Sequence, residues 1–208
     1  MVTYTTLLSM WAKSTLPNAS KEIIGIFRMM QSYGQRTDTV GYSSLLSALS
    51  KNKDPEAPLQ ALEVFTSMIA AGLRADTTAW TILLSTWTRS RRPDKEERVQ
   101  ELFDEMVASG VQPNAFTYSC LLGMWSHSRR RDSREKILGI FDSICKHLVR
   151  LDGYGFKVLL MALTKAVGLH EAADKTEGRE EKVQDLFRQM LDSGCQPNMV
   201  TYTTLLSM

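Results

Sequence analysis

The chain has 208 residues, a hydrophobic fraction of 43% and a formal net charge of +2. No apolar run approaches the roughly 18 to 20 residues of a membrane span, so we expect no membrane partner. A charge this small does not by itself indicate nucleic acid, and any electrostatic interpretation depends on where the charges lie along the chain.

The sequence repeats at a fixed period. The first ten residues, MVTYTTLLSM, return unchanged as residues 199–208. We predict a single array over 1–208, with repeats at 1–38, 39–76, 77–114, 115–152 and 153–198 and the first helix of a further repeat at 199–208. Such a period predicts a solenoid whose repeats bury their apolar faces against their neighbours. The unchanged copy further predicts that the chain is a window of a longer, duplicated array.

Each repeat carries two apolar patterns with helical spacing, one in each half. In the second repeat they are Tyr42, Leu45, Leu46 and Leu49, followed by Ala61, Val64, Phe65 and Met68. The spacing places each set on one helical face. Gly34, Gly72, Gly110 and Gly194 follow the second pattern, where a left-handed residue commonly ends a helix. The sequence predicts an all-α fold, an α-solenoid of helix-turn-helix repeats.

A mixed, mostly polar face remains on each first helix once the core columns are removed. Its fifth place holds Thr5, Ser43, Thr81, Ser119 and Lys157. The last residue of each repeat is Asp38, Asp76, Asn114, Asp152 or Asn198. Two interpretations of this last column stay open. Asp and Asn are good N-caps for the helix that follows, and they also offer a ligand different hydrogen-bonding groups.

The thirteenth place is basic in all five repeats. Its residues are Lys13, Lys51, Arg89, His127 and Lys165. The helix dipole favours cations near a C-terminus, whereas a regular basic column also suits successive phosphates. We favour phosphate contact, with the dipole as the alternative. The arginines of the inter-helix turns, at 91–92, 129–131 and 134, are expected to be solvated.

With these columns in place, the sequence resembles the pentatricopeptide repeat family. The strings VTYTTLLSMWAKS, FTYSCLLGMWSHS, ELFDEMVASGVQPN and DLFRQMLDSGCQPN match its repeat over essentially the whole chain. The resemblance implies a right-handed superhelix that binds single-stranded RNA and reads about one base per repeat. The protein-binding tetratricopeptide repeat is the nearest alternative, but its W-x2-L-G-x2-Y signature is not seen.

The resemblance also assigns roles to the columns. The fifth and last residues of a repeat select the base, and the basic thirteenth residue contacts the RNA backbone. The second residues of adjacent repeats sandwich the base; here they are Val2, Val40, Thr78, Phe116, Tyr154 and Val200. A hydroxyl with Asp favours guanine and a hydroxyl with Asn favours adenine, so the expected target is 5′-GGAGN-3′.

The sequence departs from the family pattern at several places. Every repeat exceeds the family's usual length by at least three residues, and the excess lies in the turn between the helices. The fifth repeat has Lys157 at its reading place and eight further residues around HEAADKTEGREE, so we expect it to accept any base or to bend the superhelix. Phe116 and Tyr154 are larger than the aliphatic residue expected in the sandwich. We favour stacking on a base, with packing against a neighbouring helix as the alternative.

These features predict a sequence-selective single-stranded RNA-binding module that is not an enzyme and uses no cofactor, metal or small-molecule substrate. No phosphate-binding glycine loop or HExxH pair is present, and His127, His147 and His170 share no ligand spacing. The alternatives are a scaffold in a ribonucleoprotein, such as an organellar ribosome, and a protein-binding solenoid. The chain opens on repeat sequence, so we expect no targeting signal within it, and a mitochondrial or plastid location is implied by the resemblance alone.

Overall fold

The computed structural model describes residues 19–34, 37–52, 54–147, 149, 151, 154–155, 158–159, 161–162 and 188. Within these ranges the secondary structure consists of seven α-helices and contains no strand. None of the helices in the described part is both long and apolar enough to cross a membrane.

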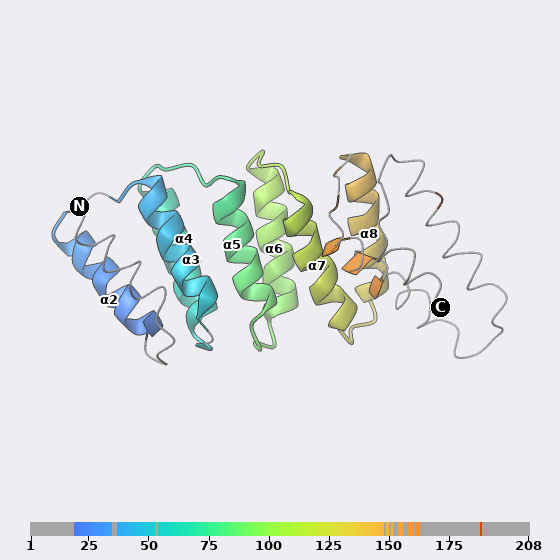
Figure 1. Ribbon diagram of the computed structural model, residues 1–208, viewed down its shortest axis with the longest axis horizontal. Helices are drawn as coiled ribbons and strands as arrows, with labels where there is room; N and C mark the ends of the chain where they lie inside the picture. The colour runs from blue at the N-terminus through green and yellow to red at the C-terminus, as the bar shows by residue number, and fades with distance from the viewer. Residues whose placement is uncertain are drawn as a thin grey trace. The chain divides into compact units, whose positions relative to one another are not determined.

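The helices alternate between two kinds, and both recur every 38 residues (Figure 1). The first helices of successive repeats are α3 (Thr39–Lys51), α5 (Thr77–Thr88) and α7 (Ala115–His127). The second helices are α2 (Ala19–Ser32), α4 (Ala57–Ala70), α6 (Lys95–Ala108) and α8 (Ser133–Lys146). The expected all-α, helix-turn-helix repeat fold is confirmed.

Contacts divide the chain into two compact units, Met1–Gln112 and Pro113–Met208. In the first unit, α3 packs against α2, α4 and α5, and α5 packs against α4 and α6. In the second unit, α7 packs against α8. Each first helix of the first unit therefore contacts its own partner and the helices of a neighbouring repeat, as a stacked repeat fold requires.

The apolar columns form the core. Both columns of the second repeat are buried, with every member at most 4% exposed. Aromatic contacts join one repeat to the next: the rings of Phe27 on α2 and Tyr42 on α3 lie 5.7 Å apart, and those of Phe65 on α4 and Trp80 on α5 lie 4.5 Å apart. Because burial of one large apolar side chain contributes roughly 1.5–3 kcal/mol, these columns stabilise the packing of neighbouring helices.

The second helices end at glycines that have a positive φ. The angles are 66° at Gly34, 77° at Gly72 and 75° at Gly110. Around Gly72, its own N–H donates to the carbonyl oxygen of Ile69 at 2.9 Å, and the N–H of Leu73 donates to that of Met68 at 3.2 Å. This pair of bonds satisfies carbonyls that the helix end would otherwise leave unpaired. The predicted glycine stop is confirmed at these three helices.

Candidate nucleic-acid interface

The first helices begin with one shared arrangement. Asp38, Asp76 and Asn114 are the N-caps of α3, α5 and α7, with extended backbone at each cap. In each case the side-chain Oδ1 accepts a hydrogen bond from the backbone N–H three residues later, at 2.8, 2.8 and 2.9 Å. The capping interpretation of the Asp/Asn column is thus correct for these three residues.

Capping uses only one of the two terminal atoms of each side chain. Oδ1 faces the helix, while the residues themselves are exposed to solvent. The second atom is Oδ2 in Asp38 and Asp76, which accepts hydrogen bonds, and Nδ2 in Asn114, which donates them. The same three side chains can therefore cap a helix and also offer a ligand two different kinds of hydrogen-bonding group.

The hydroxyls at the fifth place are less open than the sequence pattern suggests. Ser43 on α3 is half-buried, whereas Thr81 and Ser119 are only 6% and 5% exposed. The hydroxyl of Thr81 donates to the carbonyl oxygen of Thr77 at 2.5 Å, and that of Ser119 donates to the carbonyl oxygen of Ala115 at 2.8 Å. Because the hydroxyl proton is directed to the helix, the remaining lone pairs can act only as acceptors.

Where the structure describes it, the second place of a repeat is solvent-exposed. Val40 on α3 is 72% exposed, Phe116 on α7 is 57% exposed and Tyr154 is 65% exposed. Thr78 on α5 is exposed as well. Single exposed apolar side chains are common, but here they recur at one place of successive helices, next to the caps. The aromatic rings of Phe116 and Tyr154 can stack on the faces of bases.

The basic column lies at the C-terminal ends of the same helices, and its members differ in what they contact. Lys51, the last residue of α3, is exposed. Arg89, the C-cap of α5, donates through Nη2 to the carbonyl oxygen of Ser50 near the end of α3. His127, the last residue of α7, has Nδ1 at 2.8 Å from the carbonyl oxygen of Gly123, one turn back on its own helix.

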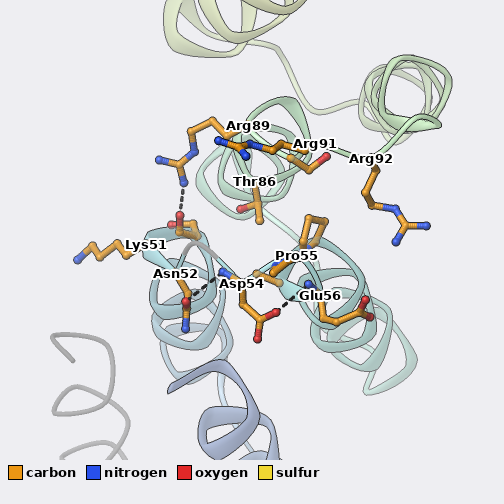
Figure 2. Close-up of a pocket in the computed structure, with 13 residues that line it drawn as sticks. Lys51, Asn52, Asp54, Pro55, Glu56, Thr86, Arg89, Arg91 and Arg92 are labelled. Atoms are coloured by element: carbon orange, nitrogen blue, oxygen red, sulfur yellow. Dashed lines mark hydrogen bonds between the residues drawn. The ribbon is translucent and has the colours of Figure 1, made fainter. Parts of the chain in front are cut away.

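Figure 2 shows the edge of the first unit where the inter-helix turns meet. A cleft of about 710 Å³ lies between the turn after α3 and the turn after α5, lined by residues that include Asp54, Arg89 and Arg91. Arg92 pairs with Asp94 at 3.0 Å, and in the second unit Arg130 pairs with Asp132 at 3.2 Å. The hydrogen bond from Arg92 holds the pKa of Asp94 below its usual value of 3.8. These pairs lie at equivalent places of two repeats, so two arginines of the turn edge serve local structure.

Eight of the predicted site residues lie outside the described residues. They are Val2, Thr5, Lys13, Asp152, Lys157, Lys165, Asn198 and Val200. Their roles stay predictions. Ser43 and Asp76 form a predicted reading pair, and the structure describes both residues within the first unit. Ser43 lies on α3 and Asp76 caps α5, and these two helices pack together.

The sequence patterns did not identify one residue that contacts a cap, Thr117. Thr117, three places after Asn114, donates its hydroxyl to Asn114 Oδ1 at 2.9 Å and accepts from the Asn114 N–H at 3.4 Å. This reciprocal pair is a capping box. The spacing of Asn and Thr three residues apart at a helix start was the available signal. Within the described ranges, no group of three or more His, Cys, Asp or Glu side chains could hold a metal ion.

The fold and the recurring caps define a repeat protein built from helical hairpins. The sequence profile of the pentatricopeptide repeat domain matches residues 63–127 and 139–208, which is more than half of the chain. The chain therefore belongs to the pentatricopeptide repeat family. No curated protein matches the sequence.

Solved structures of this family share the fold. The pentatricopeptide repeat domain of Arabidopsis thaliana protein-only RNase P 1, in complex with tRNA, has 17% identity and a TM-score of 0.69, over 97% of this chain and 94% of that one. Maize PPR10 has 21% identity and a TM-score of 0.58, over all of this chain and 31% of that one. PPR10 in complex with an 18-nt psaJ RNA element has 19% identity and a TM-score of 0.51, over 97% and 36%. At these identities the likeness concerns the fold.

Proposed function

We propose that the chain is a sequence-selective module for single-stranded RNA that reads about one base per repeat and carries out no catalysis itself. The observation that carries the proposal is the second terminal atom of each cap: an acceptor in Asp38 and Asp76, and a donor in Asn114. Membership of the pentatricopeptide repeat family supports it. So do the relatives solved in complex with tRNA and with the psaJ RNA element.

The outward atoms match the edges of the two purines. Guanine presents N1–H and N2–H, which are donors, so Oδ2 of an Asp can accept from one and a fifth-place hydroxyl oxygen from the other. Adenine presents N1, an acceptor, beside its amino group, so Nδ2 of an Asn can donate to N1 while the hydroxyl oxygen accepts from the amino group. The proposed target is 5′-GGAGN-3′, in which Asn114 selects the adenine.

The exposed second-place side chains supply affinity that does not depend on sequence. Val40 and Thr78 are the second residues of helices α3 and α5, which pack together in the first unit. We assign them to the two sides of one base, and we assign Phe116 and Tyr154 to stacking in the second unit. Stacking of a base on an aromatic ring such as that of Phe116 or Tyr154 contributes roughly 1–3 kcal/mol per base. By family membership we place this function in a mitochondrion or plastid.

A second candidate function, protein binding, is supported by the surface of the second helices α4 and α6. A mostly apolar cleft of about 630 Å³ lies between α4 and α6, with Phe65 and Trp80 among its lining residues. Ile69 on α4 and Val107 on α6 are about half exposed on the second helices. An apolar surface on this face supports protein contact, as in a scaffold of a ribonucleoprotein such as an organellar ribosome, or in a purely protein-binding solenoid.

Fluorescence anisotropy with short labelled RNAs separates these functions. The 208-residue chain is titrated with RNA containing GGAG, with a scrambled purine RNA and with a pyrimidine RNA, each at two salt concentrations. We expect the GGAG RNA to bind most tightly, and all affinities to fall with salt by about 0.7 log units per log unit for each phosphate contacted. Equal affinity for the three RNAs, with the salt dependence retained, would replace base reading by the scaffold function. No binding to any RNA would leave a protein-binding solenoid.

A further inference from the structure

The three described caps differ at the third place of the helix that each begins. Gly41 stands there in α3, Ala79 in α5 and Thr117 in α7. All three donate their backbone N–H to the cap side chain. Of these three residues, Thr117 alone has a side-chain hydroxyl, and this hydroxyl also donates to the cap. The cap that holds an amide therefore receives two donors on one atom, Asn114 Oδ1, at 2.9 Å from both the nitrogen and the hydroxyl oxygen of Thr117.

Two donors on one atom decide which way the amide faces. If the Asn114 amide were turned over, its NH2 group would meet the backbone N–H of Thr117, which cannot accept, and the Thr117 hydroxyl would lose the oxygen to which it now donates. The Thr117 oxygen also accepts from the Asn114 backbone N–H at 3.4 Å, which directs its own proton towards Oδ1. Thr117 is fully buried, so its hydroxyl is shielded from water. The NH2 group of Asn114 is consequently held outward.

We propose that Thr117 is a positioning residue, which holds the Asn114 amide with its NH2 group facing the ligand and so enforces preference for a base that presents an acceptor, such as adenine N1. The inference rests on the proposed RNA-reading function. A carboxylate needs no such control, because its two oxygens are chemically equivalent. This is consistent with Ala79 and Gly41 standing behind Asp76 and Asp38.

The test compares the affinities of GGAG and GGGG RNAs, which differ only at the third base. Thr117→Val removes the hydroxyl with little change of volume, and Thr117→Ala introduces the residue that α5 has at this place. Loss of one hydrogen bond that orients the amide is expected to reduce the adenine-over-guanine affinity ratio roughly three- to tenfold in both variants. Thr117→Ser keeps the hydroxyl and should keep the ratio.

The same Thr117 substitution made in an Asn114→Asp protein separates a positioning role from a merely structural one. In Asn114→Asp, the cap has two equivalent oxygens, so adding Thr117→Val should leave the base preference unchanged although it still weakens the capping box. Circular dichroism melting checks that each variant is folded at the assay temperature. A ratio that shifts equally in both backgrounds would assign Thr117 to stability alone and overturn the inference.

A gain-of-function arm tests the same idea in the first unit. Asp76→Asn should move the preference at the second base from guanine towards adenine, and adding Ala79→Thr should increase the adenine preference further. Thr117 variants with the wild-type ratio, together with no added effect of Ala79→Thr, would overturn the inference. A wild-type chain that does not discriminate adenine from guanine would instead contradict the proposed function, so the two failures are distinguishable.

Discussion

The two ends of the first helices differ in how regular their side-chain hydrogen bonds are. At the N-terminal ends of α3, α5 and α7, an Asp or Asn side chain accepts a hydrogen bond from the backbone N–H three residues later, with nearly the same distance at each cap. At the C-terminal ends the basic residues follow no common geometry: Lys51 is exposed, Arg89 reaches the carbonyl oxygen of Ser50, and His127 turns back on its own helix.

The proposed RNA-reading function accounts for this difference. A base edge is read by donors and acceptors in fixed positions, so the residue that reads it must be held, and a cap holds it. A phosphate needs only a nearby positive charge, which Lys, Arg or His can provide from several positions. The Asp/Asn column is therefore restricted in chemistry and geometry, whereas the basic column is restricted in charge alone.

The largest expected effect comes from changing the outward atom of a cap while keeping the cap. In Asn114→Asp, Oδ1 can still accept from the Thr117 N–H, so helix content should be unchanged. The preference at the third base should move from adenine to guanine by roughly ten- to a hundredfold, judged from the 1–3 kcal/mol by which one good base contact discriminates. Competition binding with the two RNAs measures the change.

Asn114→Ala is the matched control for this substitution. It removes the cap bond, so we expect a loss of about 1 kcal/mol of stability, together with loss of preference at the third base. If Asn114→Asp lost helix content as Asn114→Ala does and did not change base preference, the Asp/Asn column would serve capping only.

An intermediate effect is expected when the C-terminal end is altered. Lys51→Gln should reduce the slope of log affinity against log salt by about 0.7, because one phosphate contact is lost, and should leave the melting temperature unchanged. Arg89→Gln should reduce the slope and also destabilise the fold by about 1 kcal/mol, since the bond to Ser50 is lost. Identical effects of both variants on melting would contradict the distinct arrangements of the two side chains.

The smallest expected effect concerns the pair of Arg92 and Asp94 in the turn between α5 and α6. The carboxyl group of Asp94 has a lowered pKa, first because Arg92 hydrogen-bonds to it, so the pair stabilises the fold above pH 3.8 and this contribution is lost as the pH falls through the lowered pKa. In Arg92→Gln, the pKa of Asp94 should rise towards 3.8. A carbon-13 NMR titration of the carboxyl group measures it, and RNA affinity at neutral pH should show that Arg92 is not a phosphate contact. An unchanged pKa would mean that the pair is not formed in solution.

The sequence was sufficient for the fold because the fold depends on recurring patterns. Apolar spacing gave the buried columns around Leu45 and Phe65, and glycine placed the helix ends at Gly72 and Gly110. The Asp/Asn column was visible as a column, and its N-cap geometry was one of the two interpretations that the pattern allowed.

The finer features of the site could not be read from the pattern, because they depend on rotamers and on neighbouring helices. Sequence spacing places Thr81 and Ser119 on a polar face, but their exposure depends on what lies around them, and both are nearly buried. Likewise, the bond from Arg89 to Ser50 joins residues of two repeats. The bond from the Thr117 hydroxyl to Asn114 Oδ1 is a local feature of one repeat, so the periodicity of the sequence does not encode it.

The glycine stops have a consequence for how arrays of this kind can be rebuilt. In three successive repeats, the cap residue stands four places after the glycine: Asp38 after Gly34, Asp76 after Gly72 and Asn114 after Gly110. A chain joined at this short linker keeps every later cap in phase, whereas the turn between the two helices can change length, as the sequence of the fifth repeat indicates. Exchange or multiplication of whole 38-residue repeats at the glycine linker is therefore a route to an array designed for a different RNA sequence.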